Sequence, residues 1–507
     1  MTSTSATIAN PASSTARFDM LVVGGGINGT AIARDAAGRG VSVCLCEADD
    51  LAAHASSAST KLIHGGLRYL EQFAFGLVHE ALVEREVMLR TAPHLVRPLR
   101  FVLPHEPHLR PAWQIRAGLF LYDHLDLGRR TLSGSGRIGL DQHAAGNPLQ
   151  DHYRTGFVYS DAQVQDARLT VLNALDAEMH GARILTRTRC THAERSDDGW
   201  TADLQRADGR TTRVHAKTLI NATGPRATRF LDTVAHVPHQ HQLRLIKGSH
   251  IVVPKLYPGD HAYTFQLPDR RIVFAIPYEH DWTLIGTTDI EYHGDPFALA
   301  IDDDEVTYLC AAINCYFKRS ISPADVHWSY SGVRPLVDDR KARASEITRG
   351  YQLELDAGPA PLLSVFGGKV TTARHLAEDA MARLRPHLPG IGESWTRDHA
   401  LPGGERRDLD TCVDELCRAH PWLVPEVATR WIRSYGTRSE RILGSARSMA
   451  DLGPHFGGGL HAAEVDYLCR EEWAREVDDI IWRRSKLGLR MTPGNVEQLA
   501  GYLAALT

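Results

Sequence analysis

Asp19-Met20-Leu21-Val22-Val23-Gly24-Gly25-Gly26-Ile27-Asn28-Gly29 decides the fold, because an apolar strand runs directly into a glycine turn. Gly24, Gly26 and Gly29 have the G-x-G-x-x-G spacing. The first glycine allows a tight turn, the second lets the backbone approach a pyrophosphate, and the third lets the next helix pack on the strand. The stretch therefore predicts a dinucleotide-binding unit.

An acidic residue closes the second strand of this unit. A helix rich in Ala and Ile, residues 27–37, is followed by the strand Val41–Cys46 and then by Glu47. A carboxylate at this distance can accept a hydrogen bond from a ribose 2′-OH, and it repels a 2′-phosphate. We expect the ADP half of a dinucleotide here, while the motif does not distinguish a flavin from a nicotinamide.

Composition and charge exclude several classes of protein. A chain of 507 residues exceeds one hydrophobic core, so we expect two or three domains. Its net charge of −4 provides no global field that would recruit nucleic acid. The eight cysteines include no C-x-x-C pair, so they favour neither a zinc site nor a disulfide framework and fit a reducing cytoplasm. No apolar run reaches the ~18 residues of a membrane span, which leaves attachment to a membrane surface open.

Two later strands also lead into turns of small residues. Arg213–Ile220 is followed by Asn221–Pro225, and the strand that begins at Leu362 ends in Gly367-Gly368. Between them, Arg271–Pro277 and Trp282–Asp289 have a hairpin pattern, which predicts a second sheet. Beyond these units, the apolar residues recur only at the spacing of helices. The dinucleotide-binding core is therefore expected to be assembled from separated segments, with a sheet domain inserted between them.

Six motifs then follow in order: Gly24–Gly29, Ser56–Tyr69, Lys247–His250, Ile285–Asp289, Ser331–Pro335 and Phe366–Lys369. Together they resemble the FAD-dependent aerobic glycerol-3-phosphate dehydrogenases, from about Phe18 to the C-terminal helices. The resemblance implies oxidation of sn-glycerol 3-phosphate to dihydroxyacetone phosphate by hydride transfer to FAD, with electrons passed to a membrane quinone. It implies an α/β fold: a Rossmann-like FAD-binding domain of the glycine/D-amino-acid oxidase type, a β-rich substrate domain and an all-α C-terminal domain.

Domain boundaries combine this likeness with the strand and helix pattern. We expect a disordered tail at 1–16, FAD-binding segments at 17–100, 161–240 and 336–400, substrate-domain segments at 101–160 and 241–335, and the helical domain at 401–507.

Histidine and cationic side chains in glycine-rich turns form the expected substrate site. Oxidising a secondary alcohol requires a group that takes the hydroxyl proton, and a phosphate requires cationic donors. By the resemblance, His64 and Arg334 lie at the substrate carbinol, and Arg68, Tyr69 and Arg349 lie toward the phosphate. We expect catalysis by His64, Arg334 and Lys369 and substrate binding by Arg68, Tyr69, Arg349 and His250. His64 is our preferred general base, with His250 or polarisation by an arginine as alternatives. Lys369 contacts either the substrate or the N1/C2 region of the flavin.

The expected cofactor site combines the glycine turns with the hydroxyl-rich segment. The FAD contacts are expected at Gly24, Gly26, Asn28, Gly29, Glu47, Ser56, Ser57, Lys61, Gly65, Gly66, Thr223, Gly224, Gly332, Gly367 and Gly368, and no metal ligand is expected.

One stretch has the pattern of a membrane-surface helix. Residues 110–122 combine two arginines with Trp, Phe, Leu and Tyr, as expected for a helix in the headgroup zone. The alternative is a helix buried against the substrate domain. Because the implied electron acceptor is a lipid-soluble quinone, we expect a cytoplasmic protein bound peripherally to the inner face of the cytoplasmic membrane. We also expect a homodimer.

Three other functions are alternatives to the one that the resemblance implies. The nearest is an FAD-dependent glycerol-3-phosphate oxidase, or a related hydroxyacid or amine oxidase, that uses oxygen, because one fold hosts all of these activities. A soluble nicotinamide-dependent dehydrogenase is the second. A binding module without enzymatic activity is the third, and it leaves the cations in glycine turns unexplained.

Overall fold

A mixed sheet with parallel central strands is built around the strand that precedes the glycine turn. The computed structural model describes residues 15–106, 111–125, 131–269, 271–338, 350–406 and 408–506, apart from the side chains of Arg68 and Gln72. β1 (Ala16–Val23) pairs in parallel with β10 (Thr211–Asn221) and β2 (Val43–Cys46). Within the described residues the order β17-β18-β10-β1-β2-β7, with β9 on β10 and β8 on β9, gives an eight-stranded sheet.

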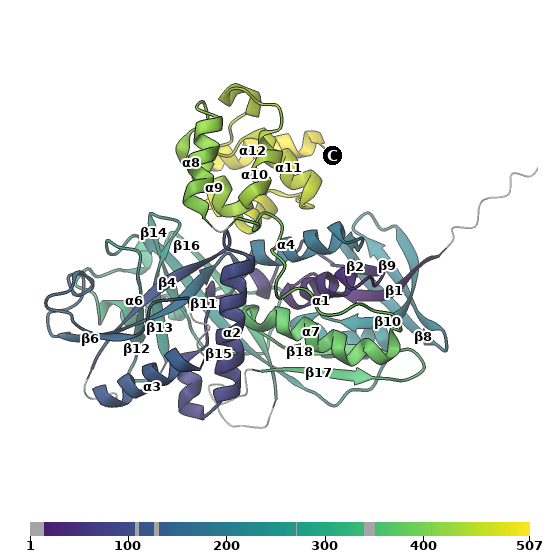
Figure 1. Ribbon diagram of the computed structural model, residues 1–507, viewed down its shortest axis with the longest axis horizontal. Coiled ribbons are helices and arrows are strands. Elements are labelled where there is room, and N and C mark those ends of the chain that lie inside the picture. The colour runs from purple at the N-terminus through teal and green to yellow at the C-terminus, as the bar shows by residue number, and fades with distance from the viewer. Residues whose placement is uncertain are drawn as a thin grey trace, which may run out of the picture.

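The remaining members of this layer come from distant parts of the chain. They are β7 (Arg183–Leu185), β8 (Thr188–Ser196), β9 (Gly199–Arg206), β17 (Tyr351–Asp356), β18 (Leu362–Gly367), α1 (Ile27–Gly38), α4 (Asp166–Met179), α7 (Ala373–Leu384) and the short α5 (Ala227–Phe230). α1 packs against both α4 and α7, which lie beside it along the sheet (Figure 1). The small side chains of α1 allow this close approach, and most of the helix is buried.

A second sheet of mostly antiparallel strands stands beside the first. Among the described residues, its ten strands follow the order β15-β11-β14-β13-β12-β4-β6-β3, with β16 on β11 and β5 on β6. The strands are β3 (Leu62–Ile63), β4 (Val96–Pro104), β5 (Gly136–Gly139), β6 (Thr155–Val164), β11 (Leu243–Pro254), β12 (Ala262–Gln266), β13 (Ile272–Tyr278), β14 (Trp282–Gly286), β15 (Ile290–Tyr292) and β16 (Trp328–Val337). The pairing of β13 with β14 is the predicted hairpin.

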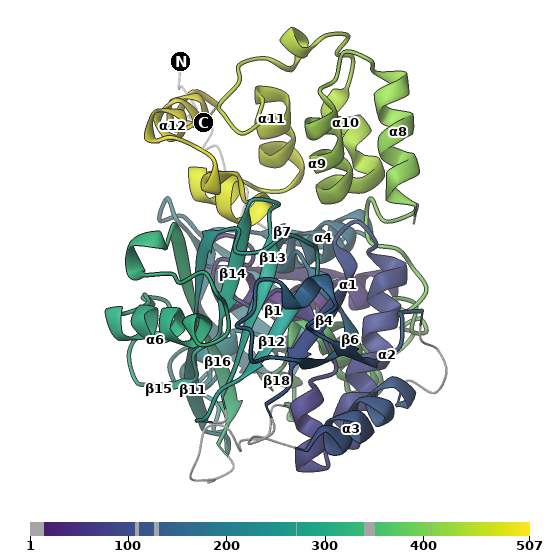
Figure 2. The ribbon, with the colours of Figure 1, turned by 90° about the vertical axis from the view of Figure 1, so that its left-hand side faces the viewer.

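Three helices accompany this second sheet: α2 (Phe75–Thr91), α3 (Ala112–His124) and α6 (Asp303–Asn314). α6 begins with a capping box, because Asp302 accepts from the Glu305 backbone while Glu305 accepts from the Asp302 backbone. α3 lies at the end of the molecule opposite the C-terminal helices (Figure 2). In the part of the chain that the structure describes, no helix is both long enough and apolar enough to cross a membrane.

The C-terminal part is helical and has its own core. It contains α8 (Leu409–Ala419), α9 (Pro425–Tyr435), α10 (Ser439–Leu443), α11 (Ala462–Glu471), the turn η12 (Asp479–Arg484) and α12 (Pro493–Leu506). Trp431 and Tyr435 are fully buried within it. Figures 1 and 2 show these helices resting on one edge of both sheets.

The α/β fold class predicted from the sequence, with its helical C-terminal domain, is confirmed. The residue boundaries expected for the domains stay predictions. Residues 1–14 of the expected tail lie outside the described residues, and β1 begins at Ala16.

Candidate functional site

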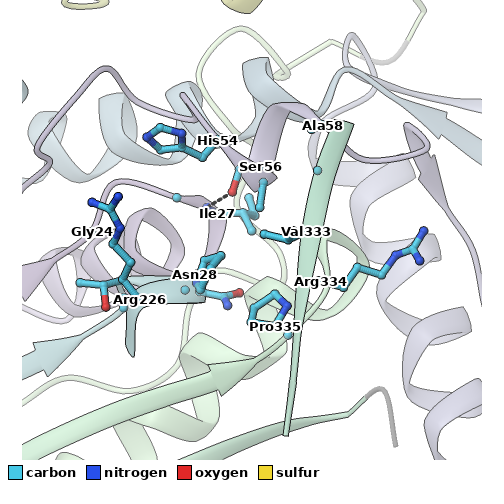
Figure 3. A pocket seen from close by; sticks show the side chains of 18 of the residues that line it. Gly24, Ile27, Asn28, His54, Ser56, Ala58, Arg226, Val333, Arg334 and Pro335 are labelled. Atoms are coloured by element: carbon cyan, nitrogen blue, oxygen red, sulfur yellow. Dashed lines mark hydrogen bonds between the residues drawn. The ribbon is translucent and has the colours of Figure 1, made fainter. Parts of the chain in front are cut away.

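One cavity of about 650 Å³ lies between the two sheets. The turn after β1, the segment 52–60 and the ends of β10 and β18 line it from the first sheet, and β11 and β16 line it from the second. Figure 3 shows the glycine turn on one side of β16 and Arg334 on the other. The cavity therefore joins the predicted dinucleotide-binding turn to the predicted substrate residues.

The glycine turn has the geometry that its spacing predicts. Gly24 adopts a φ of +114°, and a Cβ there would lie 2.4 Å from the Ala222 carbonyl oxygen. A Cβ on Gly29 would lie 2.0 Å from the Gly24 oxygen, so Gly29 serves helix–strand packing and does not line the cavity. The backbone N–H of Ile27 donates to Ser56 Oγ at 2.9 Å. Backbone at the start of α1 is thus held against the cavity, where a helix N-terminus favours an anion.

Glu47 lies beside this turn and lines the cavity. Its carboxylate accepts from the Gly25 N–H at 2.6 Å and from the Asp49 N–H at 2.9 Å. Burial raises the pKa of Glu47, although these two backbone donors oppose the rise. The carboxylate is therefore fixed in place, and lone pairs remain that can accept from a ribose hydroxyl.

Asn28 links the first glycine turn to the turn that follows β18. Its Nδ2 donates to the Gly367 oxygen at 3.1 Å, and a Cβ on Gly368 would lie 2.6 Å from that nitrogen. The Asn28 Oδ1 is buried and has no hydrogen-bond partner within the described residues. A buried acceptor without a partner costs free energy, so this oxygen fits a site completed by a polar ligand. The residues present thus fit an FAD molecule.

The other predicted cofactor residues divide into two groups. Gly26, Ser56, Thr223, Gly224, Gly332, Gly367 and Gly368 line the cavity. Ser57, Lys61, Gly65 and Gly66 do not line it.

Those four residues contact other protein groups just outside the cavity. Ser57 donates to the His54 carbonyl oxygen, and Lys61 Nζ pairs with the buried Asp166 carboxylate at 3.0 Å. The Gly65 N–H donates to the Tyr122 hydroxyl at 2.8 Å, and a Cβ on Gly66 would collide with the Tyr69 ring. Their side of the wall is therefore occupied by other protein groups.

The predicted substrate residues that the structure describes share this cavity. His64, Tyr69, His250, Arg334 and Lys369 all line it. Lys369 Nζ lies 4.2 Å from the centre of the Tyr69 ring, and Arg334 Nη1 lies 3.1 Å from Asp289 Oδ1. Two cations that face one cavity favour an anionic ligand. The Arg68 side chain and Arg349 lie outside the described part of the structure.

His250 is buried and has a strongly lowered pKa. It is 1% exposed, its Nε2 lies 3.0 Å from Thr60 Oγ1, and its buried Nδ1 has no hydrogen-bond partner among the described residues. Burial, together with the charges of Arg334 and Lys61, lowers the pKa of His250 well below its usual value of 6.5. The imidazole is therefore neutral near pH 7, and a neutral imidazole can accept a proton.

Three residues that line the cavity were not predicted from the sequence: His54, Phe297 and Arg226. The His54 and Phe297 rings stack with centroids 3.7 Å apart and planes at 7°, and the Arg226 guanidinium carbon lies 3.8 Å above the same Phe297 ring. His54 also hydrogen-bonds Asp49 through Nε2 at 2.8 Å. Phe297 belongs to the second-sheet side and the others to the first, so no local pattern connects them.

The described residues contain no group of three or more His, Cys, Asp or Glu side chains that could hold a metal ion.

Comparison with known proteins identifies the family. The family model described as FAD dependent oxidoreductase matches residues 19–374, and that of the C-terminal domain of alpha-glycerophosphate oxidase matches residues 394–504. The chain is 55% identical to a glycerol-3-phosphate dehydrogenase of Pseudomonas aeruginosa, covering 96% of this chain and 95% of the relative. It is 49% identical to a D-erythritol 1-phosphate dehydrogenase of Brucella abortus, covering 94% and 95%.

A solved structure agrees over almost the whole chain. The glycerol-3-phosphate dehydrogenase of Bacillus halodurans, solved with FAD, superposes with a TM-score of 0.76 at 25% identity, covering 97% of this chain and 89% of that one. The chain therefore belongs to the family of FAD-dependent glycerol-3-phosphate dehydrogenases.

Proposed function

We propose that this enzyme oxidises sn-glycerol 3-phosphate to dihydroxyacetone phosphate. The observation that supports this most directly is that one cavity joins the dinucleotide-binding turn to His64, His250, Arg334 and Lys369. Bound FAD supplies a two-electron acceptor that takes the hydride from the carbinol carbon. The chain's own residues then have two tasks, which are to take the hydroxyl proton and to hold the phosphate.

A histidine takes the hydroxyl proton in this proposal. His64 is the preferred acceptor, and His250 is the alternative, although its lowered pKa makes its buried imidazole the weaker base. Both face the cavity, so geometry allows either role. Arg334 can orient the hydroxyl oxygen through a guanidinium donor, because its Nη1 is already fixed by Asp289.

Cations hold the phosphate. Lys369 and Arg334 line the cavity, and Arg68 and Arg349 stay the predicted phosphate ligands. An Arg–phosphate fork is among the stronger hydrogen-bonded pairs and would distinguish a phosphorylated polyol from a free one. The relative named for D-erythritol 1-phosphate makes a longer polyol phosphate the natural competitor.

The substrate is tested by product formation. Holoenzyme supplied with an artificial electron acceptor should convert sn-glycerol 3-phosphate to dihydroxyacetone phosphate with a higher kcat/KM than it shows for D-erythritol 1-phosphate. The reverse order would assign the longer polyol phosphate as the substrate. Turnover of neither would refute the proposed function.

We further propose that the electrons leave to a membrane quinone at the inner face of the cytoplasmic membrane. α3 supports this, because its outer face exposes Trp113, Phe120 and Leu121, with exposed fractions of 73%, 56% and 38%. Its inner face, with Leu119 and Tyr122, is buried. An amphipathic helix with aromatic groups outside fits the interfacial zone of a bilayer. The inner face is thus packed on the protein, as the buried alternative expects, and the exposed outer face is the surface that we propose contacts the membrane.

Reoxidation kinetics test the acceptor. Enzyme reduced by substrate should be reoxidised faster by a short-chain ubiquinone analogue than by dissolved oxygen. Faster reoxidation by oxygen would instead support an oxidase. The expected homodimer stays a prediction, and a mass measurement in solution tests it.

A further inference from the structure

Trp482 connects the C-terminal domain to the second sheet. It lies in η12 and packs against the core of the C-terminal helices. It also packs in the cluster formed by β4, β6 and β14, together with Leu489. Its ring stacks on Trp328, at the start of β16, with centroids 4.4 Å apart and planes at 9°. A single side chain therefore belongs to both units.

The stack continues from Trp328 to the wall of the cavity. Trp328 contacts Tyr330 with ring centroids 5.0 Å apart, and Tyr330 stacks on His250 at 4.8 Å with planes at 14°. Trp482, Trp328, Tyr330 and His250, which we call the aromatic seam, thus form an unbroken series of ring contacts. Its last member is the buried histidine that faces the cavity.

Tyr330 also fixes the segment of the first sheet that borders the cavity. Its hydroxyl donates to the Ser59 carbonyl oxygen at 2.8 Å, and Lys61 Nζ lies 4.8 Å from the centre of its ring. The neighbouring Thr60 hydrogen-bonds His250. A displacement of Tyr330 would therefore move both the histidine and the hydroxyl that orients it.

Ion pairs hold the C-terminal end of the seam in place. On either side of Trp482, Arg483 Nε pairs with Asp50 at 2.6 Å and Asp479 pairs with Arg187 at 2.8 Å. Arg484, fully buried, donates to the same Asp50 carboxylate. Buried pairs of this kind add little net stability, but breaking one is costly, so they fix geometry. η12 is thereby anchored to the first sheet.

We propose that Trp482 and Trp328 are positioning residues, through which the C-terminal helical domain holds Tyr330, and so His250, in the orientation that the reaction requires. The proposal rests on the proposed function in that His250 faces the substrate. The ring contacts determine where the imidazole points, while the cavity walls determine where FAD binds. Loss of the seam should therefore slow chemistry more than it weakens cofactor or substrate binding.

The test compares W482L, W482F and W422L. Trp422 is a matched control, because it packs partly buried in the same helical core and takes no part in the seam. We expect W482L to lower the rate constant of flavin reduction by glycerol 3-phosphate roughly tenfold or more, since small misplacements near the reacting centre are costly. FAD content and substrate affinity should change far less, W482F should restore most of the rate, and W422L should leave it unchanged.

A second variant covers the case in which W482L fails to fold. W328L removes the stacking ring from the side of the second sheet and leaves the C-terminal domain intact, and it should also slow flavin reduction. If parental reduction rates accompany a lowered Tm in W482L and W328L, the tryptophans are merely structural and the proposal is wrong.

The absorption spectrum of the bound flavin provides a readout without substrate. Displacing His250 should shift this spectrum in W482L and W328L but not in W422L. If the parent enzyme itself is not reduced by glycerol 3-phosphate, the proposed function fails, and the spectral comparison still decides whether the seam positions His250. Parental spectra in W482L and W328L would then overturn the positioning role.

Discussion

His64 and His250 face the same cavity from different surroundings, and only one of them is the general base in the simplest mechanism. Removing the imidazole that takes the hydroxyl proton should slow flavin reduction about a hundredfold or more, because positioned proton transfer contributes that much. We predict this loss for His64→Ala, with a changed pH dependence and a smaller change in affinity. Stopped-flow reduction of both His64→Ala and His250→Ala measures it.

The pair of variants assigns the base without further assumptions. If His64→Ala keeps the parental reduction rate while His250→Ala loses it, the proton goes to His250. Similar losses in both would indicate that the two imidazoles act together on the hydroxyl.

A third histidine controls acid stability. His94 is fully buried, neither ring nitrogen has a hydrogen-bond partner among the described residues, and burial lowers its pKa to about 3. The unfolded chain has a pKa near 6.5 at this residue, so as the pH falls below that value it binds a proton that the folded chain does not. The free energy of unfolding should therefore fall between pH 6.5 and about 3.

Chemical denaturation at several pH values tests this contribution. His94→Leu should reduce the acid-dependent loss of stability, whereas His152→Leu, at an exposed position, should leave it unchanged. An identical pH profile for His94→Leu and the parent would contradict the assignment.

The loop between β15 and α6 provides the clearest prediction among the elements. It inserts Phe297 between His54 and Arg226 at the rim of the cavity. A ring stacked between an imidazole and a guanidinium gains both stacking and cation–π energy, so it should retain FAD. Phe297→Ala should release FAD several-fold faster on dilution, followed by flavin fluorescence. Ile290→Ala, exposed in the neighbouring β15, should release it at the parental rate.

α3 is the second element with a testable outer face. Phe120→Ser with Leu121→Ser should weaken binding to anionic liposomes and slow quinone reduction, because both side chains are exposed and their burial in lipid would be lost. Flavin reduction by substrate should be spared. Val424→Ser, exposed on the C-terminal domain, is the matched control for liposome binding. Parental liposome binding by the double variant would place the docking surface elsewhere.

The elements also show which features a sequence can reveal. Gly24, Gly29 and Glu47 lie within one continuous strand–helix–strand unit, so their spacing predicted their geometry. Lys61 could not be placed in this way, because its partner Asp166 lies 105 residues further along the chain. The helix α6 was not predicted, although the sequence contains the residues of its capping box, Asp302 and Glu305.

For the whole molecule, the order of strands was only partly predictable. The parallel pairing of β1 with β10, and of β10 with β18, joins segments that lie well over a hundred residues apart in the sequence. Turns of small residues after each of these strands indicated that the strands share a site. The turns did not indicate which residues of the second sheet line the rest of that site. The aromatic seam joins residues from three distant regions of the chain, so spacing within any one region could not predict it.

The central claim concerns the molecule as a catalyst: a phosphorylated polyol bound at one end of the cavity reduces FAD bound at the other. Anaerobic mixing of the yellow holoenzyme with substrate, followed by the flavin absorbance, tests it most directly. We predict that sn-glycerol 3-phosphate bleaches the flavin fully, whereas glycerol at the same concentration does so far more slowly, because it lacks the phosphate that cations lining the cavity, such as Lys369, would hold. Equal bleaching by both, or by neither, would contradict the account.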